Sequence, residues 1–100
     1  MSKDWRLENL ESNPLLRGAR FIRKPYRMYA PNWDHDHCAG CWVKFMEIGT
    51  DSPQETILHE GFAVTDDYPK GAEYEWVCPS CFEEFGQAME FVSIKSQNEG

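Results

Sequence analysis

Hydrophobic residues near the start of the chain show a weak helical pattern. The apolar residues of this pattern are Trp5, Leu7 and Leu10, and the pattern stops at Asn13 and Pro14. Residues 1–13 are therefore predicted to form a short helix or an arm that precedes the rest of the fold.

Residues 18–29 are rich in aromatic and β-branched side chains interspersed with basic ones, which predicts an extended segment. Pro25 lies inside this segment, and Pro31 follows it. Because proline cannot donate to the hydrogen-bond ladder of a sheet, we expect an edge strand rather than a central one. A loop over residues 30–36 is predicted to come next.

The middle of the chain changes from a helical to an extended pattern. Trp42, Phe45 and Met46 have i, i+3, i+4 spacing, which predicts a short helix. Residues 56–65 predict a strand, and a stretch rich in Asp, Pro and Gly then predicts a turn. Residues 74–77 are expected to return as the second strand of a hairpin.

Near the C-terminus, apolar residues recur with a helical period and predict an amphipathic helix over residues 79–92. The apolar stripe consists of Phe82, Phe85, Met89 and Val92. Gly86 lies inside this pattern and costs the helix about 1 kcal/mol relative to alanine. A short strand over residues 91–94 is the alternative for the last part.

Four cysteines form two C-x-x-C pairs, with 36 residues between the inner two. No apolar run approaches the roughly 18 residues of a membrane span, and the N-terminus lacks a signal-peptide pattern, so we expect a soluble, cytoplasmic protein. A reducing cytosol argues against disulfides. Two residues between ligands let a tight turn direct two thiolates at one metal ion, and two such turns complete a tetrahedron. The prediction is a closed, structural Zn²⁺ site made of Cys38, Cys41, Cys78 and Cys81.

A cysteine turn, a hairpin and a helix that carries the second cysteine pair predict a small α+β domain of the zinc-ribbon or treble-clef type. The chain of 100 residues fits a single domain, with 1–13 as an arm or short helix and 17–95 as a zinc-stabilised core. The positive end of the helix would stabilise the thiolates of the second pair. An aromatic core is expected beside the metal, made of Trp42, Phe45, Phe62, Tyr74, Trp76, Phe82 and Phe85.

Four potential metal ligands, Asp34, His35, Asp36 and His37, directly precede Cys38. Imidazole and carboxylate groups both bind zinc, so a histidine could replace a cysteine at the metal. The two residues between His35 and Cys38 would let both side chains bind one metal ion. His37 directly precedes Cys38 and could share the metal with it less easily. The favoured interpretation is that these histidines donate hydrogen bonds to sulfur while the aspartates orient them.

The net charge of −7 disfavours general binding to a phosphate backbone, but the charge is unevenly distributed. Residues 1–30 hold seven Lys/Arg against three Asp/Glu, whereas residues 31–100 hold three against fourteen. The acidic part would speed encounter with a basic protein partner. A basic strip could instead be a solvated strand face or bind an acidic partner or nucleic acid. This strip consists of Arg17, Arg20, Arg23, Lys24 and Arg27.

Three sequence blocks carry a resemblance to a known family. They read WDHDHC-x-x-CW at 33–42, HEGF at 59–62 and W-x-C-x-x-CF at 76–82. Together they resemble small bacterial proteins of an uncharacterised zinc-ribbon-like family, over roughly residues 14–92. The resemblance implies a bacterial, single-domain, cysteine-ligated metal protein. An interaction, accessory or immunity-type role is consistent with its small size and acidity.

The histidine-aspartate block at 34–37 also resembles the D-H-D-H motif of the ββα-metal endonucleases, in which a histidine activates water near Mg²⁺. A metal-dependent nuclease is therefore an alternative, although the block abuts the first cysteine pair and residues 79–92 contain no histidine or asparagine. A rubredoxin-like iron site is another alternative. Rubredoxin turns generally have glycine where Trp42 and Phe82 stand. His59 is expected to be an ordinary strand residue.

Overall fold

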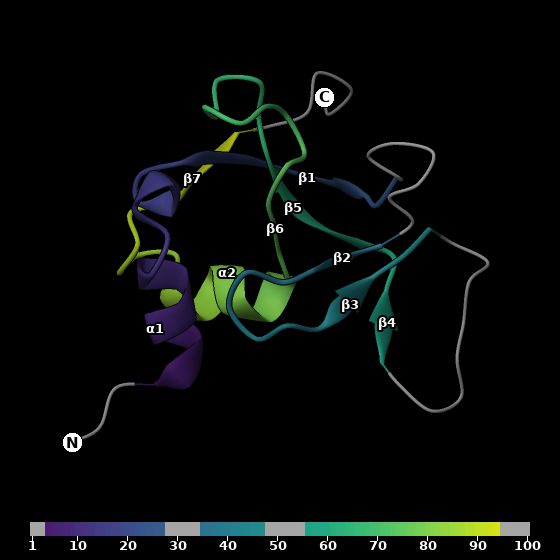
Figure 1. Cartoon of the computed structure of the whole chain (residues 1–100), viewed down its shortest axis with the longest axis horizontal. Coiled ribbons are helices and arrows are strands. Elements are labelled where there is room, and N and C mark those ends of the chain that lie inside the picture. The colour runs from purple at the N-terminus through teal and green to yellow at the C-terminus, as the bar shows by residue number, and fades with distance from the viewer. Residues whose placement is uncertain (1–3, 28–34, 48–55, 95–100) are drawn as a thin grey trace.

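The computed structural model describes residues 4–27, 35–47 and 56–94, which form an α+β fold (Figure 1). Two α-helices and a short 3-10 helix accompany seven strands within these residues. In chain order the elements are α1 (Trp5–Glu11), the 3-10 helix η1 (Pro14–Leu16), β1 (Arg20–Pro25), β2 (Asp36–His37), β3 (Lys44–Phe45), β4 (Ile57–Leu58), β5 (Glu60–Val64), β6 (Trp76–Val77), α2 (Pro79–Phe85) and β7 (Val92–Ile94).

The strands form two sheets. The larger sheet has the order β6-β5-β1-β7, with β7 parallel to β1 and the other pairs antiparallel. The smaller sheet has the order β2-β3-β4. The predicted hairpin is present as β5 and β6, where Ala63 pairs with Trp76.

The predicted N-terminal helix is also present. It begins where the Asp4 carboxylate accepts a hydrogen bond from the Arg6 amide, which satisfies a free N–H group of the first turn. It ends at Glu11 with Ser12 as its C-cap, and η1 then begins at Pro14. Leu10 is fully buried, so this short helix is held by packing rather than by its own stability.

The predicted edge position of β1 is wrong, because β1 lies between β5 and β7. Strand β7 pairs with residues Arg20 to Ile22 of β1, whereas β5 pairs with residues Phe21 to Pro25 of β1. Pro25 therefore lies beyond the part of β1 that has neighbours on both sides. The proline is tolerated there because that end of the strand borders β5 alone among the described strands.

The short helix predicted from Trp42 to Met46 is absent, and Lys44–Phe45 forms strand β3 instead. Trp42 has a φ angle of 69°, which is incompatible with a right-handed helix. The predicted strand over 56–65 is extended but divided, because the chain leaves the small sheet after β4 and enters the large sheet with β5. Part of the loop predicted over 30–36 lies outside the described residues, and its last residue belongs to β2.

The C-terminal helix is shorter than predicted. Helix α2 begins at Pro79 as expected but ends at Phe85, with Gly86 as its C-cap. Residues 92–94 pair with β1 as strand β7, the predicted alternative, and Val92 is 43% exposed rather than packed. Sheet pairing therefore outweighs the helical pattern after the glycine.

The larger sheet has a packed layer on each face. Toward α2, Phe62 stacks on Phe82 with ring centroids 3.8 Å apart, and Phe21 meets Phe91 at 4.6 Å. Figure 1 shows α2 crossing this face of the sheet. On the other face, Trp76 packs against the aromatic rings of Phe45 in β3 and of Tyr26, the residue that follows β1. These contacts join the two sheets.

Gly61 provides the space that this second layer needs. A Cβ atom there would lie 2.6 Å from Cε1 of Phe45 and 3.1 Å from the Val77 carbonyl oxygen. Gly61→Ala should therefore lower the free energy of unfolding by about 2 kcal/mol, as expected for an overpacked site, when measured by urea unfolding. In a Phe45→Leu background the same substitution should cost less. An equal cost in both backgrounds would contradict this contact.

Candidate metal centre

The first cysteine pair lies in the turn between β2 and β3. The backbone closes the turn with hydrogen bonds from the Trp42 amide to the Cys38 carbonyl (3.0 Å) and from the Cys38 amide to the Val43 carbonyl (2.8 Å). The Gly40 amide donates to the Cys38 sulfur at 3.3 Å. This arrangement directs backbone N–H dipoles at a sulfur atom and favours its thiolate form.

Gly40 also brings this turn close to α1 and to the second cysteine pair. A Cβ atom at Gly40 would lie 3.1 Å from the Cys81 sulfur and 3.3 Å from Cγ of Leu10. The Asn9 side chain donates to the Gly40 carbonyl at 2.8 Å. Helix α1 therefore fixes the position of the cysteine turn, a role that the sequence pattern did not indicate.

The second cysteine pair lies at the start of α2. Cys78 is the N-cap, and its sulfur accepts a hydrogen bond from the Cys81 amide at 3.4 Å. Pro79 follows at the first helical position, where its missing N–H group costs nothing. The Cys78 amide donates to the Cys38 sulfur at 3.3 Å, which links the two pairs directly.

All four sulfur atoms meet in one cluster within 4.8 Å of one another. The Cys41 and Cys78 sulfurs are 3.6 Å apart, close to the ~3.8 Å expected between two sulfurs on a tetrahedral zinc ion. The cysteines are free thiols, and all except the half-buried Cys41 are buried. The donor set and its spacing therefore suit one metal ion.

The thiols influence one another strongly because they are so close. Hydrogen bonds from Cys78 and Cys81 lower the pKa of Cys38 far below its ordinary value. The resulting Cys38 thiolate raises the pKa of Cys78 and of Cys81. Without a cation, the Cys38 thiolate is favoured and the neighbouring cysteines stay protonated. A divalent metal ion supplies the positive charge that lets all four ionise together.

The histidine-aspartate block does not join this cluster in the described part of the chain, where four cysteines alone form the group. The His35 and His37 rings meet edge to face at 5.1 Å, and the Asp36 carboxylate accepts a hydrogen bond from the Tyr26 hydroxyl at 2.9 Å. Asp34 lies outside the described residues. The sulfur-directed hydrogen bonds described above come from backbone amides.

Four side chains of the basic strip form ion pairs with acidic residues. The pairs are Arg17 with Glu11 and Glu90, Arg20 with Asp67, Arg23 with Glu60, and Lys24 with Glu73. Exposed pairs of this kind add little stability, but they neutralise charge locally. Less positive potential therefore remains for a bound anion than the sequence suggests.

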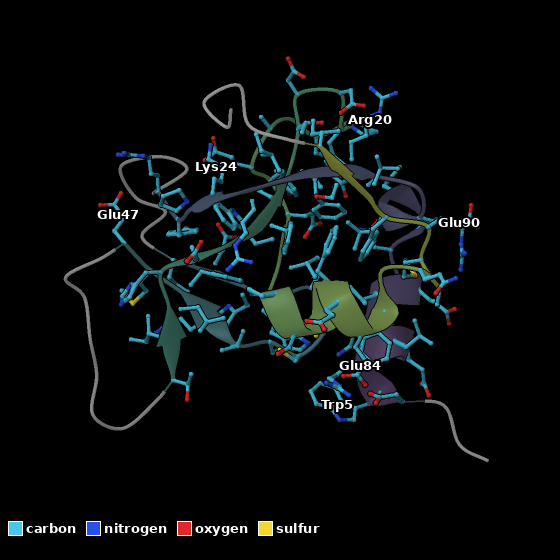
Figure 2. The ribbon with its side chains drawn as sticks, turned by 180° about the vertical axis from the view of Figure 1, so that it is seen from behind. Trp5, Arg20, Lys24, Glu47, Glu84 and Glu90 are labelled. Carbon is cyan, nitrogen blue, oxygen red and sulfur yellow. The ribbon has the colours of Figure 1, made fainter. Side chains whose placement is uncertain are left out.

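Strand alternation also divides the basic strip between two faces. Arg20 and Lys24 lie on the side of the larger sheet away from α2, as Figure 2 shows. Arg23 points to the α2 side, where its guanidinium lies 5.7 Å from the Phe62 ring centroid. Arg27 is exposed beyond the end of β1. These side chains therefore do not form one continuous basic surface.

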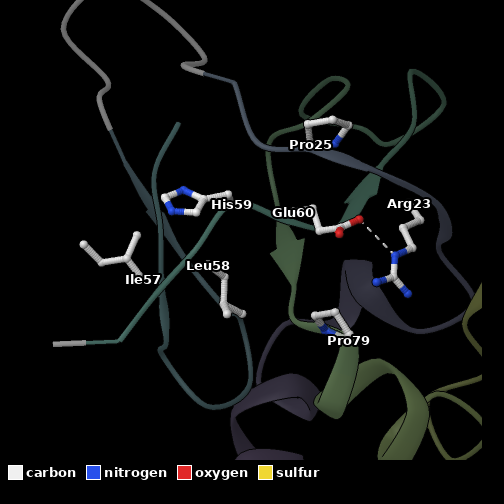
Figure 3. A pocket seen from close by; sticks show the side chains of 7 residues that line it. All are labelled: Arg23, Pro25, Ile57, Leu58, His59, Glu60 and Pro79. Atoms are coloured by element: carbon white, nitrogen blue, oxygen red, sulfur yellow. Dashed lines mark hydrogen bonds and ion pairs between the residues drawn. The ribbon is translucent and has the colours of Figure 1, made fainter. Parts of the chain in front are cut away.

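His59 lies between β4 and β5 and borders a cavity of about 570 Å³ between the two sheets (Figure 3). Its Nδ1 atom donates a hydrogen bond to the Met46 carbonyl oxygen at 2.9 Å. The ion pair of Arg23 with Glu60 also lines this cavity, as does Pro79. His59 was expected to be an ordinary strand residue; its ring has a hydrogen-bond partner, but the residue itself lies at the bend between β4 and β5.

The sequence pattern did not predict the environment of two residues near the metal centre, Trp42 and Glu75. Trp42 was expected in the aromatic core but is 63% exposed. Glu75 was assigned no role, yet it is half-buried and accepts a hydrogen bond from the Asn13 amide group at 3.1 Å. Glu75 directly precedes the buried Trp76, which is the one local signal that could have drawn attention to it.

Burial raises the pKa of the Glu75 carboxyl, and the Asp36 carboxylate adds to this effect. The folded state then binds the proton more tightly than the unfolded chain, so stability falls as pH rises from about the ordinary value of 4.5 through the folded pKa. Glu75→Gln should therefore raise Tm at pH 7. The gain in Tm should vanish below about pH 4, where the glutamate side chain of the wild type is protonated and therefore as neutral as the glutamine of the variant.

Thermal unfolding followed by circular dichroism from pH 3.5 to 8 checks this prediction. Glu83→Gln, at an exposed position on α2, is the matched control and should leave Tm unchanged. A lower Tm for Glu75→Gln at pH 7 would contradict the electrostatic interpretation.

Comparison with protein-family models, curated proteins and solved structures found no match to this chain. Among the described residues, no helix is long and apolar enough to cross a membrane.

Proposed function

We propose that this chain is a small, non-catalytic zinc-binding domain in which Cys38, Cys41, Cys78 and Cys81 hold one structural Zn²⁺ ion. The observation that supports the proposal is the cluster of four sulfurs, three of them buried. A metal ion with four thiolate ligands has no open position for water or substrate, and such sites normally stabilise a fold.

The zinc-ribbon or treble-clef assignment belongs to the same proposal. A cysteine turn between two short strands, the hairpin of β5 and β6, and a helix that begins at the second cysteine pair follow one another in the chain. These parts support the assignment, because each cysteine pair lies where backbone N–H groups point at sulfur.

The proposed role is that of a protein-interaction or accessory module, as in a bacterial immunity-type protein. Its support is the excess of fourteen acidic over three basic residues from 31 to 100. That charge favours a basic protein as partner, and the association rate should fall as salt is raised.

Metal analysis combined with thiol titration tests this function. The folded protein should contain one zinc ion per chain, and its four thiols should react only after denaturation or chelation. A folded protein without metal and with four reactive thiols would overturn the proposal. Plasmid cleavage with Mg²⁺ that is lost in His35→Ala or His37→Ala would overturn its non-catalytic part.

A further inference from the structure

A cavity of about 230 Å³ lies beside the first cysteine turn, where α1 and η1 approach β6. Its lining combines an aromatic surface with polar groups, unlike the apolar layers of the core. The lining residues that matter here are Asn9, Asn13, His37, Cys38, Trp42 and Glu75.

Trp42 lines this cavity, and it is not among the described residues packed on the hydrophobic core. Its side chain is 63% exposed, and its ring centroid is 5.7 Å from that of His37. Its φ angle of 69° is the conformation that glycine adopts at low cost and that costs another residue about 1 kcal/mol or more. Packing does not offset this strain, so a binding role would explain a tryptophan here.

Glu75 supplies a negative charge to the same cavity. Its carboxylate accepts hydrogen bonds from the Asn13 amide group and the Tyr68 hydroxyl, both neutral donors. Among residues 4–27, 35–47 and 56–94, no lysine or arginine forms an ion pair with it. Lys70 acts on Glu75 only through its charge, without an ion-pair contact, whereas Glu60 and Glu73 each pair directly with a basic side chain.

We propose that this cavity binds a cationic side chain of a partner protein, with arginine preferred, between the indole of Trp42 and the carboxylate of Glu75. A guanidinium group stacks on an aromatic face and donates two parallel hydrogen bonds to a carboxylate. Cys38 also lines the cavity, and four thiolates around a divalent ion keep a net negative charge. The inference rests on the proposed function, for which it names the group that the partner presents.

NMR titration of the ¹⁵N-labelled, zinc-loaded full chain tests this site. The probe is N-acetyl-arginine N-methylamide, and N-acetyl-citrulline N-methylamide is a neutral control of nearly the same shape. Arginine should shift the Trp42 indole and Asn13 side-chain signals saturably, with a dissociation constant on the order of 1 mM. Citrulline should bind at least about fivefold more weakly, because it lacks the charge.

Three variants locate the site. Glu75→Gln and Trp42→Gly should each weaken arginine binding at least about fivefold, whereas Glu84→Gln, a carboxylate on α2 that pairs with Arg6, should not. Equal binding of citrulline, shifts centred elsewhere, or unchanged binding by Glu75→Gln would overturn the inference. The wild-type comparison of the two probes decides the question even where a variant fails to fold.

Zinc content is measured in the same samples. A zinc-loaded chain that does not bind arginine overturns this inference alone and leaves the structural metal site in place. A folded chain without zinc overturns the proposed function.

Discussion

Removal of the metal is expected to unfold most of the chain, with a loss of the cooperative thermal transition or a fall in Tm by tens of degrees. Cys38, Cys78 and Cys81 are buried between α1, α2 and the sheets, so thiolates left without a cation would be desolvated charges in the core. A structural zinc ion contributes on the order of 10 kcal/mol, which exceeds the net stability of a typical small domain. Circular dichroism before and after treatment with a strong zinc chelator, under reducing conditions, measures the effect.

Substitution of one ligand gives the same result without a chelator. Cys81→Ser should fail to retain zinc and should unfold, because Cys81 is fully buried. Ser80→Ala, at the exposed neighbouring position in the same helical turn, is the matched control and should retain both metal and fold. A Cys81→Ser variant that keeps the wild-type Tm would count against a metal that supports the fold.

Trp76→Ala is expected to lower the free energy of unfolding by about 3 to 5 kcal/mol. The ring of Trp76 is fully buried between Tyr26 and Phe45, at 4.9 and 5.4 Å between centroids. Its indole N–H donates to the Glu73 carbonyl at 3.1 Å. Its backbone also forms a bridge with Cys38, so the loss should spread to the metal centre. Urea unfolding gives the magnitude.

Trp42 is the matched control for this prediction, because it is a tryptophan with little packing. Trp42→Gly removes an exposed ring and relieves the left-handed backbone. Its stability should stay within about 1 kcal/mol of the wild type or rise. An equal loss in the free energy of unfolding for Trp42→Gly and Trp76→Ala would contradict the claim that burial makes Trp76 the more important of the two for stability.

The metal ligands were predictable from sequence because their chemistry is local. Two residues between cysteines determine how each turn directs its sulfurs, and Pro79 after Cys78 marks the helix start that the structure contains. The hairpin of β5 and β6 was also predictable, since alternating apolar residues flank a turn rich in Asp, Pro and Gly.

The errors arose where distant parts of the chain compete with a local pattern. Val92 fits the helical stripe, but pairing of β7 with β1 places it in a strand. That same pairing makes β1 a central strand despite Pro25. Phe45 fits a helix with Trp42, yet the left-handed φ at Trp42 ends that possibility. None of these contacts is encoded by spacing along the sequence.

The surroundings of the metal centre were hidden for the same reason. Asn9 donates a hydrogen bond to the Gly40 carbonyl, and Leu10 packs against the same glycine, although both lie some thirty residues away in the chain. The basic strip read as one surface in sequence, but alternation along β1 places Arg23 and Lys24 on opposite faces. Sequence thus identified the ligands, whereas the fold was needed to identify what supports them.

X-ray absorption at the zinc edge on the purified, reduced protein tests the central claim most directly. A closed structural site predicts four sulfur neighbours at about 2.3 Å and no lighter ligand. That result would agree with the cluster of Cys38, Cys41, Cys78 and Cys81. A nitrogen or oxygen neighbour at about 2.0 to 2.1 Å would indicate a histidine, carboxylate or water at the metal, and would contradict the closed four-thiolate centre.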